Sequence, residues 1–256
     1  MKTTVEKIKS MKGKEKTSVL TAYDYSTAKA MDESGVDIIL IGDSLGMVVL
    51  GYENTLSVTM DDMLRHTGAV ARGTKNALVV ADMPAHSYDD KETAALNAEA
   101  LVKSGADSVK IENEPEIVKF LVENKIEVMG HIGLTPQTAT NFKVQGKDKE
   151  TADKLIKLAK ELENAGCYSL VLECVPVELA KKITESILIP TIGIGAGVYC
   201  DGQVLVTNDM IGLYDRFTPK FVKKYADLGQ EMKKAFADYI KDVKEGKFPE
   251  DWHSFH

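Results

Sequence analysis

The sequence has few cysteines and no long apolar run. Its 256 residues include three cysteines, at positions 167, 174 and 200, and none of them forms a CxxC motif. This pattern indicates reduced thiols and argues against a disulfide framework or a zinc site, so we expect a cytoplasmic protein. No stretch approaches the roughly 20 apolar residues of a membrane-spanning helix. The opening residues 1–16 are too polar for a signal peptide.

A cluster of positive charge is also missing. The formal net charge is −7 at pH 7, and the lysines and arginines are scattered along the chain. Proteins that bind the phosphate backbone of nucleic acids typically carry a basic stripe. We therefore expect neither nucleic acid nor a membrane as a partner, and a small-molecule substrate instead.

No low-complexity linker or Ser/Pro-rich hinge divides the chain, which predicts a single domain over residues 1–256. What recurs is a short apolar run, a polar loop and an amphipathic helix. Short runs without two-residue alternation are typical of strands buried on both faces of a parallel sheet. Seven such runs are readable: Ser18–Ala22, Ile38–Ile41, Leu78–Ala81, Ser108–Ile111, Val128–Gly130, Leu170–Leu172 and Pro190–Ile194.

An eighth strand is expected between Val204 and Leu213, and eight alternating units favour a closed (β/α)₈ TIM barrel, which takes roughly 250 residues. The clearest helix is Thr151–Ala165, which Gly166 ends. Shorter helices are predicted at Glu92–Lys103 and Glu116–Glu123. A polar extension precedes the barrel, and a charged helical tail follows it to about residue 244.

Ionisable side chains recur where the predicted strands end, which is the end where barrel enzymes build their active sites. These residues are Asp43, Asp82, Glu112, His131 and Glu173. Each one alone is readily explained as a helix cap or as half of an ion pair. Together they point to a site, because converging carboxylates repel one another unless a cation or a proton intervenes. The long connections 43–58 and 131–149 lie on the same side of the predicted barrel.

Three of these carboxylates, Asp43, Asp82 and Glu112, would form an all-oxygen site of the kind that suits Mg²⁺. Glu173 would then remain free to act as a general base. Lys110 shares strand parity with Glu112 and is expected to face the barrel interior. It either binds a substrate carboxylate or forms a salt bridge with one of the acids.

Ser44 follows Asp43 at the start of a long loop. Its hydroxyl either donates a hydrogen bond to the same substrate carboxylate or serves as an ordinary turn or cap group.

Several segments together closely resemble the ketopantoate hydroxymethyltransferase family, from about residue 3 to residue 256. GDSLGM, GHIGLTPQ and LECVP are the specific combination, and the others extend the resemblance along the chain. The others are LTAYDYSTAKAMDESGVD, VADMP, VKIE, KVQG, IPTIGIGAG, DGQVLV, FTPKFVKKY and HSFH.

The resemblance implies a barrel of the phosphoenolpyruvate/pyruvate superfamily that acts in pantothenate biosynthesis. It implies transfer of a hydroxymethyl group from 5,10-methylenetetrahydrofolate to 3-methyl-2-oxobutanoate, through an enolate stabilised by Mg²⁺. The metal would bind at Asp43, Asp82 and Glu112, and the substrate at Asp43, Ser44, Asp82 and Lys110. Glu173 corresponds to the family's proton acceptor, and His131 to an active-site histidine. Family members are homo-oligomers, often decamers.

The sequence departs from the family in one place, because the loop at 141–143 is shorter than the glycine-containing version of some members. Two rival functions compete with this one. One is a Mg²⁺-dependent 2-oxo-acid lyase or mutase of the same superfamily, which would work without folate. The other is a barrel that binds without catalysis, which would have no reason to keep converging carboxylates.

Overall fold

The computed structural model describes residues 2–138 and 143–256. These residues form two compact units, one ending at Val206 and the other beginning at Thr207. The prediction of one domain over residues 1–256 stays a prediction. In the part of the chain that the structure describes, no helix is long and apolar enough to cross a membrane.

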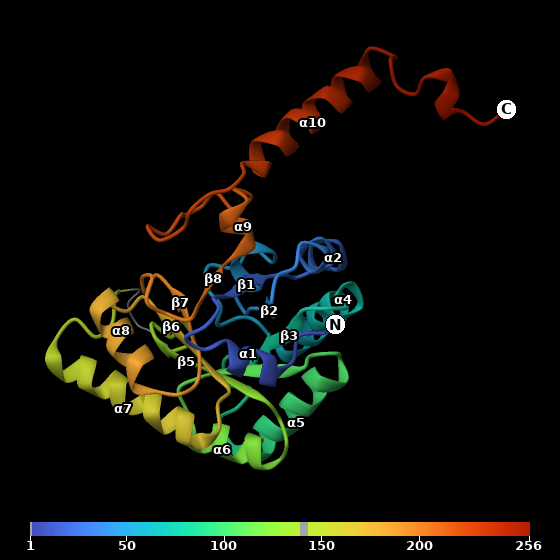
Figure 1. Ribbon diagram of the computed structural model, residues 1–256. Coiled ribbons are helices and arrows are strands. Elements are labelled where there is room, and N and C mark those ends of the chain that lie inside the picture. Colours follow the sequence, from blue (N-terminus) through green and yellow to red (C-terminus); the bar gives the residue numbers. More distant parts are fainter. Residues whose placement is uncertain (1, 139–142) are drawn as a thin grey trace. The chain divides into compact units, whose positions relative to one another are not determined.

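The first unit contains eight parallel strands that pair in chain order and close into a barrel, because β8 also pairs with β1. Helices lie outside the ring of strands (Figure 1). The predicted (β/α)₈ barrel is confirmed. The strands are β1 Thr17–Thr21, β2 Ile38–Ile41, β3 Leu78–Asp82, β4 Ser108–Glu112, β5 Val128–Gly133, β6 Ser169–Glu173, β7 Thr191–Ile194 and β8 Gly202–Leu205.

The helices of this unit are mostly the connections between successive strands, and the predicted N-terminal extension contains the first of them. They are α1 Val5–Met11, α2 Tyr25–Glu33, α3 Leu45–Val48, α4 Met60–Gly73, α5 Lys91–Lys103, α6 Pro115–Glu123, α7 Lys149–Ala165 and α8 Val177–Ser186. The second unit contains α9 Thr207–Met210, the tail helix α10 Leu228–Lys244 and a 3₁₀ turn at Asp251–His253.

Local sequence explains where the helices begin and end. The Asp148 side chain accepts a hydrogen bond from the Thr151 amide at the start of α7. Gly166 ends the same helix in the left-handed region, at φ 105°, as its position after the apolar stripe predicts. Pro115 occupies the first turn of α6, where the missing amide hydrogen costs nothing. The three helices predicted by residue range are confirmed to within two residues, and the tail helix ends at the predicted Lys244 but begins only at Leu228.

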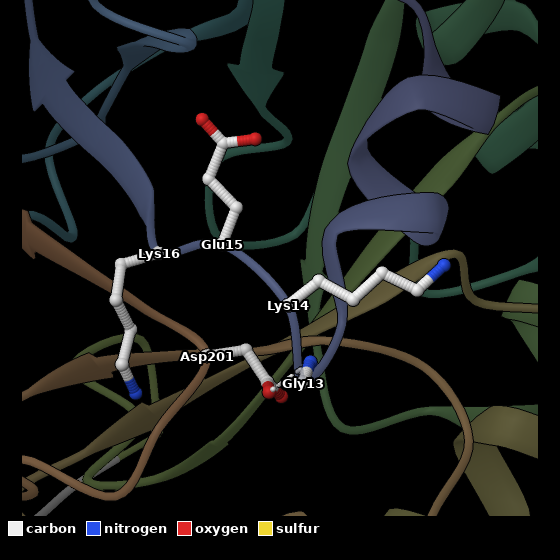
Figure 2. A pocket seen from close by; sticks show the side chains of 5 residues that line it. All are labelled: Gly13, Lys14, Glu15, Lys16 and Asp201. Carbon is white, nitrogen blue, oxygen red and sulfur yellow. Dashed lines mark hydrogen bonds between the residues drawn. The ribbon is translucent and has the colours of Figure 1, made fainter.

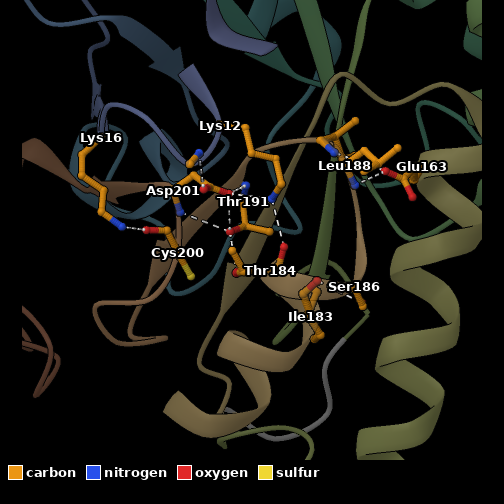
Figure 3. Close-up of polar contacts among 12 residues, drawn as sticks. Lys12, Lys16, Glu163, Ile183, Thr184, Ser186, Leu188, Thr191, Cys200 and Asp201 are labelled. Atoms are coloured by element: carbon orange, nitrogen blue, oxygen red, sulfur yellow. Dashed lines mark hydrogen bonds and ion pairs between the residues drawn. The ribbon is translucent and has the colours of Figure 1, made fainter. Parts of the chain in front are cut away.

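Hydrogen bonds around Asp201 hold the amino-terminal end of the barrel together (Figure 3). Its Oδ2 accepts from Lys12 Nζ at 2.9 Å and from the Thr191 amide at 2.9 Å. Its Oδ1 accepts from the Gly13 amide at 3.2 Å. Its backbone oxygen accepts from the Thr17 amide at 2.9 Å. The network ties the segment before β1 to the starts of β7 and β8.

A small pocket of about 160 Å³ lies beside this network. Its lining residues are Gly13, Lys14, Glu15, Lys16 and Asp201. The Asp201 side chain points at Gly13, whereas the two lysine side chains extend in different directions (Figure 2). Lys16 Nζ itself donates to the carbonyl oxygens of Val198 and Cys200. The polar groups here serve the closure of the barrel.

Candidate active site at the carboxyl ends of the strands

The ionisable residues singled out by the sequence lie at the carboxyl end of the barrel. Strand register places Asp82 beside Lys110 and Glu112 beside His131. All but one of the set are buried. The buried residues are Asp43, Asp82, Lys110, Glu112 and His131.

Two glycines let the backbone approach these side chains closely. Gly42 precedes Asp43, and a Cβ there would lie 2.7 Å from Ser44 Oγ and 3.6 Å from an Asp82 oxygen. Gly133 ends β5 at φ 102°, where a Cβ would lie 2.2 Å from the backbone oxygen of Glu173. No residue with a side chain fits either position without displacing a neighbour.

Asp82 contacts both Lys110 and the backbone of Asp43. Its Oδ1 lies 2.9 Å from Lys110 Nζ, and its Oδ2 accepts a hydrogen bond from the Asp43 amide at 3.0 Å. Burial disfavours a charged lysine, but the carboxylates of Asp82, Asp43 and Glu112 outweigh it and raise the pKa of Lys110. Of the two interpretations of Lys110, this conformation shows the salt bridge, and the ammonium remains charged at neutral pH.

The buried surroundings of Asp43 change the pKa of its carboxyl group. Burial, together with the charges of Asp82 and Glu112, raises the pKa of Asp43 to about 7, against the opposing effects of Lys110 and Gln137. A buried carboxylate with too little positive charge nearby is stabilised by a proton or by a cation. The site is thus short of positive charge at neutral pH.

His131 lies between two carboxylates. Its Nδ1 is 3.4 Å from Glu112 Oε1, and its Nε2 is 3.2 Å from Glu173 Oε2. Burial and Lys110 oppose a charged ring, but these two carboxylates prevail and raise the pKa of His131 to about 9. A protonated His131 therefore connects the end of β4 to the end of β6.

Glu173 is the most exposed acid of the group. Its side chain is 19% exposed, compared with 3% for His131 and 4% for Asp82. A general base has to come within hydrogen-bond distance of the proton that it removes. Its position at the rim of the buried cluster therefore fits the role that the sequence predicts for it.

Ser44 lies at the start of α3, where it forms no side-chain cap. Its Oγ instead lies 2.9 Å from the Tyr23 hydroxyl. The structure therefore favours a role for this hydroxyl outside helix capping.

Sequence reasoning missed Gln137 and Tyr88. The side-chain Nε2 of Gln137 donates to Asp43 Oδ2 at 2.8 Å, and the backbone N–H of Gln137 donates to Glu112 Oε2 at 3.1 Å. The Tyr88 hydroxyl donates to Gln137 Oε1. Gln137 stands in the GHIGLTPQ motif, but neither side chain is ionised at neutral pH, so a search for charged strand ends passes over both.

Two expectations about the site stay predictions. Across the described residues, no three His, Cys, Asp or Glu side chains are arranged to hold one metal ion. Asp82 faces Lys110 and Asp43 faces Gln137. The shorter loop expected at Asn141–Lys143 falls mostly on residues 139–142, outside the described part of the chain.

Comparison with known families identifies the family of the chain. The model of the ketopantoate hydroxymethyltransferase family matches residues 2–251. The chain belongs to this family.

Relatives named 3-methyl-2-oxobutanoate hydroxymethyltransferase agree with the family assignment. One from Enterococcus faecalis is 58% identical, over 94% of this chain and 90% of its own. One from Clostridium botulinum is 56% identical, over 100% of this chain and 96% of its own. One from Syntrophus aciditrophicus is 55% identical, over 99% of this chain and 97% of its own. The family is therefore one of hydroxymethyltransferases.

Solved structures extend the likeness to the fold of a superfamily. A 2,3-dimethylmalate lyase of the PEP mutase/isocitrate lyase superfamily has a TM-score of 0.62 at 14% identity, covering 98% of this chain and 91% of its own. A phosphoenolpyruvate phosphomutase from Streptomyces platensis has a TM-score of 0.64 at 11% identity, covering 95% and 88%. At these identities the likeness shows the fold alone, and that fold is the one predicted for this ketopantoate hydroxymethyltransferase family member.

Proposed function

We propose that the chain transfers the one-carbon unit of 5,10-methylenetetrahydrofolate to 3-methyl-2-oxobutanoate, giving 2-dehydropantoate (ketopantoate) and tetrahydrofolate in pantothenate biosynthesis. The observation that carries the proposal is the match along 94–100% of the chain to relatives named for hydroxymethyl transfer to 3-methyl-2-oxobutanoate, at 55–58% identity. It favours the transferase over a lyase or mutase of the same superfamily, for which the support is a shared fold.

Mg²⁺ fits the chemistry of the donor set. Asp43, Asp82 and Glu112 are three buried carboxylates beside Lys110 and His131, and burial with the charges of Asp82 and Glu112 raises the pKa of Asp43. In the proposed enzyme these three would hold the ion, once the contact of Asp82 with Lys110 adjusts. The ion would supply Lewis-acid polarisation of the substrate ketone.

The chain's own residues account for binding. The charged Lys110 attracts the carboxylate of the 2-oxo acid, and Ser44 donates a hydrogen bond to it. Asp43 and Asp82 complete the substrate contacts. Lys110 is 7% exposed, so its attraction for an anion is poorly screened by water.

Glu173 is the proposed base. It removes the proton from C3 of the 2-oxo acid, and the resulting enolate attacks the methylene carbon of the folate. Water then displaces the folate nitrogen from that carbon, which supplies the hydroxyl group and releases tetrahydrofolate. His131 Nε2 lies 3.2 Å from Glu173 Oε2 and holds the Glu173 carboxylate in place. General base catalysis typically contributes about 10²–10⁴-fold to a rate.

The test is proton NMR of the protein mixed with 3-methyl-2-oxobutanoate, methylenetetrahydrofolate and Mg²⁺, beside a control with chelator. Ketopantoate is expected with metal and absent with chelator. In D₂O without folate, the C3 proton should exchange, and Glu173→Gln should slow that exchange by about 10²-fold or more. Exchange at the undiminished rate would refute the base, and folded protein that makes no ketopantoate would refute the function.

We also propose that the enzyme is a cytoplasmic homo-oligomer, as the family resemblance implies, with a decamer as the expected assembly. Light scattering at micromolar concentration tests this assembly, and a monomeric mass would contradict it.

A further inference from the structure

Gln137 contacts the site through every polar group of its side chain. Nε2 donates to Asp43 Oδ2 at 2.8 Å and to the Met83 carbonyl oxygen at 2.9 Å. Oε1 accepts from the Tyr88 hydroxyl. A side-chain amide carries two donor hydrogens and one acceptor oxygen, so both hydrogens and the oxygen are engaged.

The Asp43 carboxylate and the Met83 carbonyl determine which end of the Gln137 side-chain amide faces Asp43, because both groups only accept hydrogen bonds. Rotating the amide by half a turn would place Gln137 Oε1 against these two acceptors. The Tyr88 hydroxyl donates to Oε1 on the other side and holds the amide in place. Tyr88 is 8% exposed, so water would replace this bond poorly if the hydroxyl were removed.

The same residue reaches a second carboxylate through its backbone. The backbone N–H of Gln137 donates to Glu112 Oε2 at 3.1 Å. Gln137 therefore connects the ends of β2 and β4, and its bond to the Met83 carbonyl connects them to β3. It engages one oxygen of Asp43, Oδ2, and among the described residues it leaves Oδ1 for a ligand.

We propose that Gln137 is a positioning residue for the divalent cation and the 2-oxo acid: it fixes the orientation of Asp43 and Glu112, and Tyr88 holds the Gln137 side chain in place. The inference rests on the proposed function, because it concerns the carboxylates proposed to bind the ion. Partners of metal ligands typically change metal affinity by about 10–100-fold when they are removed.

The experiment measures Mg²⁺ binding to the metal-free full-length protein by calorimetry, with no turnover involved. Gln137→Met keeps the length of the side chain and removes its hydrogen bonds, and should weaken Mg²⁺ binding by about 10-fold or more. Gln137→Glu places a carboxylate against Asp43 and should weaken it further. Gln203→Met makes the same chemical change at an exposed amide that donates to the Gly197 carbonyl, and should leave Mg²⁺ binding unchanged.

Tyr88→Phe removes one hydroxyl, and it keeps the test valid if changes at Gln137 impair folding. It should weaken Mg²⁺ binding less than Gln137→Met does. The double variant Tyr88→Phe/Gln137→Met should bind Mg²⁺ as weakly as Gln137→Met alone, because Tyr88 acts through Gln137. Additive losses would contradict this order of action.

Steady-state kinetics separates positioning from a merely structural role. Excess Mg²⁺ should restore kcat of Gln137→Met while the Mg²⁺ concentration at half-maximal rate stays raised. Wild-type affinity for Mg²⁺ in Gln137→Met, Gln137→Glu and Tyr88→Phe, in protein that makes ketopantoate, would overturn the inference and leave the proposed function standing. A wild-type protein that neither binds Mg²⁺ nor makes ketopantoate would overturn both.

Discussion

Asp43 and Asp201 are buried aspartates at opposite ends of one barrel, and their surroundings have opposite effects. Burial raises the pKa of Asp43 to about 7, with Asp82 and Glu112 adding to the effect. Burial also opposes the charge of Asp201, but hydrogen bonds from Thr191, Lys12 and Gly13 lower the pKa of that carboxyl below its usual range. Partners, more than depth, decide whether a buried carboxylate is stable.

The difference separates two uses of the same residue type. At the amino-terminal end each oxygen of Asp201 has a donor, and the carboxylate joins segments that are far apart in the sequence. At the carboxyl end several acids share few positive groups. The first arrangement stabilises the fold, whereas the second is expected to cost stability until a ligand arrives.

The largest expected effect concerns turnover. Asp43→Asn removes a charge from the proposed metal and substrate site and should lower kcat/KM by about 10³-fold. Asp201→Asn, measured at a temperature where it is folded, should stay within a few-fold of the wild type. Ketopantoate formation followed by NMR checks both. Equal losses in the two variants would remove the functional distinction between the two ends.

The next largest effect concerns the free energy of unfolding, and here Asp201, not Asp43, is the residue whose replacement should be harmful. Asp201→Asn leaves Lys12, whose side chain is 19% exposed, without its anionic partner and should lower the free energy of unfolding by about 3 kcal/mol at pH 7. Because the pKa of Asp201 is lowered in the folded chain, its contribution is present above the unfolded pKa of about 4 and is lost as the pH falls through the folded value. Urea unfolding at pH 7 and in acid should show the difference shrink.

Asp43→Asn should stabilise the metal-free protein, by about 1–2 kcal/mol at pH 8. A carboxyl whose pKa is higher in the folded chain binds its proton more tightly there. The cost of ionising Asp43 in the folded chain therefore accumulates as the pH rises from the unfolded pKa of about 4 to the folded pKa of about 7, and it is fully present above that. The gain should vanish below pH 4. A destabilised Asp43→Asn at pH 8 would show that the pKa of Asp43 is not raised.

The smallest effect comes from a surface pair that serves as a scale for the others. Lys103 Nζ lies 3.1 Å from Glu99, and the lysine side chain is 76% exposed. Lys103→Ala should change the free energy of unfolding by no more than about 0.5 kcal/mol, because solvent and salt screen such pairs. A larger loss in urea unfolding would mean that exposed pairs rival the Asp201 network.

Much of the barrel could be predicted from the sequence because its strands are short apolar runs between turn signals. β2 is found at its predicted bounds, and β5 is underestimated because the polar His131 interrupts the apolar run. The eighth strand begins at Gly202, before its predicted window at residue 204, because half of this strand is not apolar. Pattern alone therefore places strand cores better than strand ends.

The candidate site divides in the same way. Charged residues at strand ends could be predicted because strand parity and a common end of the sheet bring them together. The pairing of Lys110 with Asp82 could not be decided, because it depends on which acid lies nearest. Gln137 and Tyr88 lie in loops, where no periodic pattern predicts the backbone. Their role in the site depends on the orientation of the Gln137 side-chain amide. The Lys12–Asp201 contact joins residues 189 positions apart in the sequence and has no local signal.

The pairing of β1 with β8 has a consequence for how the chain is made. Ribosomes add about 5–20 residues per second, so β8 emerges on the order of ten seconds or more after β1. During that interval β1 lacks its β8 neighbour and presents unpaired backbone groups, which favour association with other chains. Capture of Lys12 and the Gly13 amide by Asp201, the residue just before β8, closes this vulnerable edge as soon as the last strand arrives.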